Sequence, residues 1–158
     1  MHSTESSHPW QLWIDTGGTF SDCLALSPNG TVSRLKVLSN SVLRGRVVAQ
    51  PDERTVQVDI VWPVTQDIFK GFKFLPAPRT VGVPGSFVSQ IDRVDISKNL
   101  VHLSDPLRKK IKGETIEITS HEEVPVLAAR LLTGTPLSGT FPPIEMKLGS
   151  TRGTNAIL

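Results

Sequence analysis

The stretch Leu43–Ile60 (LRGRVVAQPDERTVQVDI) decides the fold expected for the middle of the chain. Apolar and polar residues alternate over residues 44–49 and again over residues 56–60, so each segment has one apolar and one polar face, as β-strands do. Between them, the residues Pro51-Asp52-Glu53-Arg54 have the composition of a hairpin connection. The stretch therefore predicts antiparallel strands joined by a turn.

The same two-residue period continues to about residue 119, with breaks that are rich in Pro, Gly and Asp. The strands expected in this region cover residues 43–50, 55–62, 70–75, 80–83, 87–96, 100–103 and 114–119. Residues 41–120 are therefore interpreted as a small antiparallel β-barrel or sandwich, inserted between two flanking segments.

The flanking segments carry a different pattern. Before the barrel, residues 11–15, 20–26 and 31–38 predict three short antiparallel strands joined by tight turns. After it, Pro125–Leu132 predicts a helix, because strong helix formers follow a proline in the first turn and Gly134 provides a stop.

The last residues complete the expected domain organisation. A strand is predicted at residues 144–148, and the loop after it leads into a helix start at which the chain stops, which favours a truncated fragment. We expect an α+β chain in which residues 11–40 and 121–158 form one partial domain and residues 41–120 form a second. Residues 1–10 are expected to be a disordered tail.

The composition excludes several classes of protein. The 158 residues are 38% hydrophobic and 20% charged, which is enough for a buried core and argues against disorder. A formal charge of +2 predicts no general attraction to nucleic acid, and no apolar run reaches the roughly 20 residues that span a bilayer. The first residues lack the apolar core of a secretory signal, so we expect a cytoplasmic protein. The single Cys23, inside an apolar strand, is expected to be a buried, inert thiol.

Residues 14–22, Ile-Asp-Thr-Gly-Gly-Thr-Phe-Ser-Asp, form the clearest candidate site. Its polar and turn residues are Asp15, Thr16, Gly17, Gly18, Thr19 and Asp22. Adjacent glycines let backbone N–H groups approach a phosphate without interference from a Cβ atom, and the threonine hydroxyls add donors. Asp15 would hold a hydrated Mg²⁺ that bridges nucleotide phosphates, and Asp22 would orient a water, a hydroxyl or the metal shell. An ordinary Gly-Gly hairpin is the alternative interpretation.

This motif resembles the first phosphate loop of the actin-like ATPase superfamily and, more narrowly, the N-terminus of the hydantoinase/oxoprolinase family. A second segment, residues 148–158, resembles the part of that family that follows its first helix. There, Ser150, Thr151 and Asn155 could present hydroxyl, N–H and amide groups to an anion or a lactam carbonyl. The alternative is that these residues cap a helix.

The resemblance covers residues 11–40 and 121–158 and implies an incomplete ribonuclease-H/actin-like subdomain. It implies that the parent is an ATP-dependent hydrolase of cyclic amides, such as 5-oxoproline or hydantoins, with ATP and Mg²⁺ as cofactors. Asp15 and Asp22 would be catalytic, with Asp15 on the metal side, and residues 16–19 would contact phosphate together with the second segment. The chain alone is expected to be inactive, because the rest of the nucleotide site would lie elsewhere.

Two other functions stay open on the sequence alone. Sugar kinases share the Asp and the Gly-Gly-Thr part of the motif, so an actin-like sugar-kinase relative is one alternative. The other is a non-catalytic binding or assembly module, in which the inserted barrel recruits a partner subunit. Neither alternative involves nucleic acid or a membrane.

Overall fold

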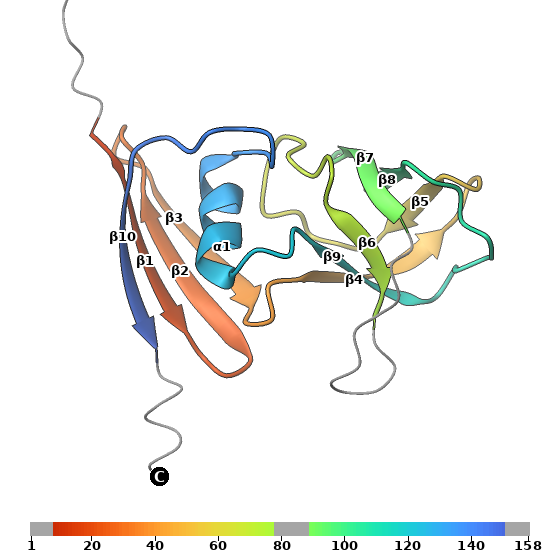
Figure 1. Ribbon diagram of the computed structural model, residues 1–158, viewed down its shortest axis with the longest axis horizontal. Helices are drawn as coiled ribbons and strands as arrows, with labels where there is room; N and C mark the ends of the chain where they lie inside the picture. Colours follow the sequence, from red (N-terminus) through yellow and green to blue (C-terminus); the bar gives the residue numbers. More distant parts are fainter. Residues whose placement is uncertain (1–7, 78–88, 151–158) are drawn as a thin grey trace, which may run out of the picture.

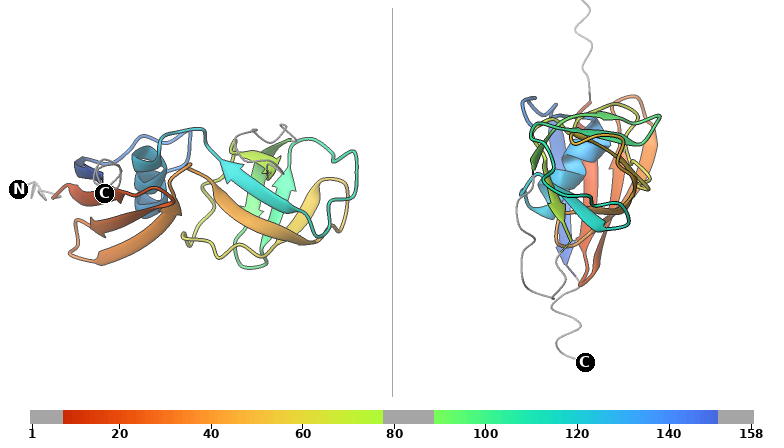
Figure 2. Two further views of the ribbon diagram at one scale, coloured as in Figure 1. Left: turned by 90° about the horizontal axis from the view of Figure 1, so that it is seen from below. Right: turned by 90° about the vertical axis from the view of Figure 1, so that its right-hand side faces the viewer.

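The computed structural model describes residues 8–77 and 89–150. They form two units that lie end to end, a small sheet with one helix and a closed β-barrel (Figures 1 and 2). The expected strand at residues 80–83, most of the expected tail, and the candidate residues Thr151 and Asn155 lie outside the described residues.

The sheet has four strands in the order β10-β1-β2-β3 (Figure 1). Their bounds are β1 Trp10–Thr16, β2 Phe20–Leu26, β3 Val32–Leu38 and β10 Ile144–Ser150. The first three strands are antiparallel, whereas β10 lies parallel to β1. The β2–β3 hairpin closes through Gly30, whose φ of 84° favours glycine, and through the Ser27–Asn29 side-chain contact.

Alternation along β1 gives the sheet two different faces. Leu12 and Ile14 are buried on the side that carries the helix, whereas Trp13 and Asp15 point to the opposite side. No helix or strand of the described residues covers that second side, which we call the open face.

The helix α1, Val124–Thr133, covers the other face of the sheet (Figure 1). Pro125 fits the first turn because the missing N–H would be unpaired there in any case, and Gly134 ends the helix in a left-handed conformation with φ 68°. Leu127, Ala128 and Leu131 are buried beneath it.

The barrel closes in the order β4-β5-β8-β7-β6-β9. Its strands are β4 Leu43–Ala49, β5 Thr55–Val58, β6 Lys73–Pro76, β7 Ser89–Asp95, β8 Leu100–Leu103 and β9 Thr115–Thr119. Inward-facing residues such as Val56, Phe74 and Ile118 are fully buried, as the alternating pattern requires. Of the two arrangements expected for this region, the structure has the barrel.

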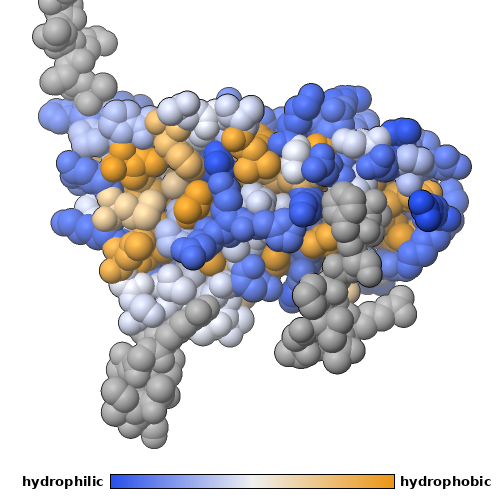
Figure 3. Space-filling view, viewed as in Figure 1, coloured by the Kyte–Doolittle hydropathy of each residue, from blue (hydrophilic) through white to orange (hydrophobic). Residues whose placement is uncertain are grey.

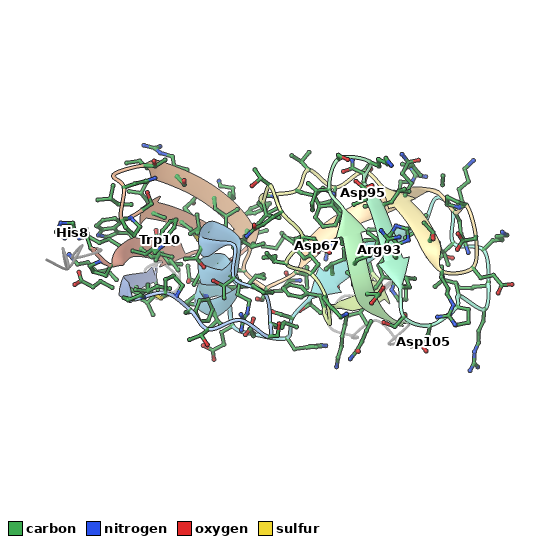
Figure 4. All side chains as sticks on the ribbon, turned by 90° about the horizontal axis from the view of Figure 1, so that it is seen from above. His8, Trp10, Asp67, Arg93, Asp95 and Asp105 are labelled. Carbon is green, nitrogen blue, oxygen red and sulfur yellow. The ribbon has the colours of Figure 1, made fainter. Side chains whose placement is uncertain are left out.

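Two expected strands are shorter at one end: β6 begins at Lys73 rather than at residue 70, and β5 ends early. β5 ends at Val58 rather than near residue 62, because the chain leaves the barrel there and runs toward α1. Trp62 packs on Phe69 with ring centroids 4.8 Å apart, and Gln66 donates a hydrogen bond to the Gly134 carbonyl at 3.1 Å. Asp67 then accepts the backbone N–H of Val94 in β7, at the place shown in Figure 4. The two units consequently share one apolar core.

The expected fold class is wrong. About 45% of the described residues are in strands and α1 is their one helix, so the described chain is mostly β, with a closed six-stranded barrel as its larger unit. An α+β chain built on a ribonuclease-H/actin-like subdomain is therefore not what the structure shows. The expected fold class relied on short motifs in the two flanking segments. The antiparallel strands between these segments contain more residues than the motifs and make the described chain mostly β.

Candidate functional site

Asp15 and Asp22 lie directly opposite each other on the open face, since β1 and β2 pair in that register. Both carboxylates are exposed. The Lys36 ammonium lies 3.4 Å from Asp22, whereas Asp15 has no ion pair within the described part of the chain. Like charges placed directly across a strand pair repel each other, so this pair favours an added cation.

The turn after Asp15 is shaped by two backbone hydrogen bonds. Gly17 donates to the Phe20 carbonyl at 3.0 Å, and Ser39 donates to the Thr19 carbonyl at 2.9 Å. Gly18 does not have a left-handed φ, and a Cβ atom added there would meet nothing within 4 Å. Neither conformation nor packing against the described residues therefore requires glycine at position 18. The open space leaves its backbone accessible to a ligand.

Strand alternation divides the predicted site residues between two cavities. Asp15 and Asp22 line an open groove of about 770 Å³ on the open face. Thr16 and Ser150, which are paired across β1 and β10, line a polar cavity of about 650 Å³ beside the start of α1. Gly149 borders both cavities. The structure thus gathers these residues at the end of β1, but on its two sides.

The polar cavity is a poor place for an anion. The first turn of α1 contains Pro125, which has no N–H, and the Val126 N–H already donates to the Glu123 carbonyl. Glu122 lies at the same rim, and its hydrogen bonds from Arg130 lower its pKa, which keeps it ionised. The start of α1 therefore offers few free N–H donors to a phosphate, whereas the open-face groove is lined by the cations Arg34, Lys36 and Lys147.

Two neighbours of the acidic pair were not identified from the sequence. Lys36 lies opposite Asp22 because the turn around Asn29 sets the β2–β3 register, and that turn signal could have revealed it. A Cβ atom at Gly149 would lie 3.5 Å from the Asp15 carboxylate, at ordinary van der Waals distance, so Gly149 lies directly beside this side chain. The parallel pairing with β10 that places Gly149 beside Asp15 has no local sequence signal.

Cys23 lies next to Asp22 but faces the core. It is 4% exposed, and burial, with a smaller effect of the Asp22 charge, raises the pKa of its thiol to about 11. The structure confirms that the cysteine is buried, and a thiol that stays protonated is a weak nucleophile.

The donor set of the open face fits Mg²⁺. This cation retains several waters and is usually held by one or two carboxylates together with substrate phosphates. Asp15 and Asp22 supply such a pair at an exposed position, next to an accessible glycine backbone. Within residues 8–77 and 89–150, no group of three or more His, Cys, Asp and Glu side chains forms an all-protein metal cage.

Comparison of the chain with protein-family models, with curated proteins and with solved structures finds no match. The described residues also contain no helix with the length and apolar character needed to cross a membrane. The function must therefore be argued from the site itself.

Proposed function

We propose that the end of β1 binds the phosphates of Mg²⁺-ATP, and that the chain supplies this phosphate site to an ATP-dependent hydrolase of cyclic amides. One observation carries the phosphate site: the register places Asp15 opposite Asp22, beside a turn in which Gly18 is exposed and has open space around it. A cation would satisfy the carboxylates, and a phosphate would accept the exposed Gly18 N–H.

The proposed roles of Asp15 and Asp22 differ because Asp22 has an ion-pair partner among the described residues and Asp15 does not. Asp15 has no ion-pair partner among the described residues, so its carboxylate is the metal ligand, directly or through a water. Asp22 is partly neutralised by Lys36 and orients water in the metal shell. The Gly18 backbone N–H donates toward phosphate oxygen. Bound Mg²⁺ would neutralise negative charge on the phosphates.

The substrate class rests on the resemblance of residues 14–22 and 148–158 to hydantoinases and oxoprolinases, in which ATP is used to open a cyclic amide. The phosphate site supports the ATP half of this proposal, because a nucleotide needs both a metal ligand and backbone donors. Ser150, at the end of β10, pairs with Thr16 and lies on the opposite side of the sheet from the acidic pair.

The phosphate site is tested by titrating the chain with Mg²⁺-tripolyphosphate, followed by calorimetry or NMR. We expect weak binding, with a dissociation constant of about 1 mM. Asp15→Asn should weaken binding at least about tenfold, because it removes the metal-side charge while keeping the shape of the side chain. If the Asp15→Asn variant bound like the wild type, the metal assignment would be wrong.

A pair of glycine variants separates binding from folding. Gly18→Ala should weaken binding and leave stability unchanged, because the added methyl group enters open space where the ligand approaches. Gly30→Ala should do the opposite, since Gly30 has a φ of 84° and lies in the turn at the far end of β2. Equal binding by wild type and Gly18→Ala would show that phosphate does not approach this turn.

A further inference from the structure

We infer that the open face also holds the base of the nucleotide, stacked on Trp13. This inference rests on the proposed phosphate site and extends it along β1. Trp13 lies two residues before Asp15, so the two side chains share the open face and are separated by about 7 Å.

The register arranges the open face in two rows across the sheet. The first row consists of Lys147, Trp13, Leu24 and Arg34, and the second consists of Gly149, Asp15, Asp22 and Lys36. Both rows line the groove of about 770 Å³, which is within the usual range for small-molecule sites. The groove therefore has an aromatic row next to an acidic, metal-binding row.

The first row has the chemistry of a base-stacking platform. Trp13 is half-buried, and the Lys147 ammonium lies 6.0 Å from its ring centroid. Neither Lys147, beyond its contact with the Trp13 ring, nor Arg34 forms an ion pair with another described residue, so both positive charges can attract an anionic ligand. An aromatic ring flanked by unpaired cations is the combination that holds nucleobases with their phosphates.

The order of groups along β1 follows the order of groups in a nucleotide. Trp13 would contact the base, Asp15 would lie near the metal and ribose, and the glycine turn would reach the phosphates. A covering protein helix is the competing occupant of an open sheet face. It would bury the Asp15–Asp22 pair against apolar side chains, which is costly because Asp15 has no counter-ion among the described residues.

The test compares Mg²⁺-ATP with Mg²⁺-tripolyphosphate on the whole chain, by calorimetry. We expect ATP to bind about tenfold more tightly, because one stacked base adds an interaction that tripolyphosphate lacks. Trp13→Leu should remove this preference and leave tripolyphosphate binding unchanged. Trp10→Leu is the matched control, since Trp10 lies on the opposite face of the same strand and packs against the cluster of Leu12, Ala25 and Ala129 instead. It should preserve the preference.

The outcomes separate the two proposals. Tripolyphosphate binding without a preference for ATP, or a preference that survives Trp13→Leu, would overturn the base platform and leave the phosphate site standing. No binding of either ligand would overturn both. If Trp13→Leu fails to fold, the NMR signal of the Trp13 indole in the wild type decides: it should shift with ATP and stay in place with tripolyphosphate. A signal that ATP does not move would refute the stacking.

Discussion

The barrel and the sheet use the same kind of strand in opposite ways. Each barrel strand has a neighbour on both sides, and core side chains such as Phe74 and Ile118 are completely buried. Within the described residues, the sheet has two unpaired edges and one open face, and Leu148 in its edge strand β10 is 63% exposed. Figure 3 shows apolar surface on the side of this unit that carries α1. A closed unit directs its apolar side chains inward, whereas an open unit keeps side chains available for ligands.

The parallel pair β1–β10 sharpens this contrast. Parallel strands are normally covered on both faces, but here α1 covers one face only. The open face avoids the cost of this exposure by carrying charged residues such as Asp15, Lys36 and Lys147. Charge at these positions serves solubility and ligand binding together.

The largest expected effect is Phe74→Ala in the barrel. Phe74 is fully buried, so its truncation should lower the free energy of unfolding by about 3–5 kcal/mol through lost burial and an unfilled cavity. Phe20→Ala in the sheet is the matched variant, because Phe20 is 47% exposed and should cost less than about 1 kcal/mol. Urea denaturation measures both. Similar losses for the two variants would break the contrast between the units.

The next effect concerns the ion pair that holds α1 in place. Arg130 is buried and donates two hydrogen bonds of 2.7 Å to Glu122, so Glu122→Gln should cost about 2 kcal/mol at pH 7. These hydrogen bonds lower the pKa of Glu122 below its ordinary value of 4.5. The stabilisation is therefore complete above about pH 4.5 and is lost as the pH falls through the lower, folded-state pKa.

This is checked by measuring the free energy of unfolding of wild type and Glu122→Gln between pH 3 and pH 7. The two free energies should converge at the acid end. Glu123→Gln is the control, because Glu123 is exposed and has no ion pair in the described part of the chain. If Glu122→Gln lowered the free energy of unfolding by the same amount at every pH, the assigned charge interaction would be contradicted.

The smallest effect compares one glycine from each unit. A Cβ atom at Gly45 in β4 would lie 2.4 Å from the side chain of Ile60, so Gly45→Ala should cost about 1–2 kcal/mol through overpacking. Gly18→Ala in the sheet should change stability by less than about 0.5 kcal/mol, because nothing lies within 4 Å. Thermal denaturation of the two variants measures both stability losses. A larger loss for Gly18→Ala than for Gly45→Ala would show that the sheet is the more closely packed unit.

Local signals predicted the elements well. Pro125 and Gly134 bracket α1 within one residue at each end, and alternation located the barrel strands. The Gly-Gly turn also indicated that Asp22 would come back beside Asp15 if the flanking strands paired, as they do. These features depend on a few neighbouring residues, and short-range physics is what a sequence pattern records.

Features that depend on distant residues were missed. The fold class was wrong because two short motifs were taken to define a ribonuclease-H/actin-like subdomain in residues 11–40 and 121–158, whereas the described chain is mostly β with one helix. Thr16 and Asp15 were assigned to one phosphate site, but adjacent strand residues face opposite sides of a sheet. The approach of Lys147 to Trp13 requires β10 to lie beside β1, although more than a hundred residues separate them.

The position of Cys23 makes it possible to measure how often the sheet unit opens. It is the only cysteine of the chain, it lies in β2 in the core shared with α1, and its protonated, buried thiol reacts with a labelling reagent only when the sheet opens. The barrel has no such reporter. The labelling rate therefore measures how often the sheet opens by itself. The labelling rate gives a free energy for opening of the sheet unit. If this free energy equals the free energy of global unfolding, the two units open together through their common core. If it is smaller, the ligand-binding unit opens while the barrel stays closed.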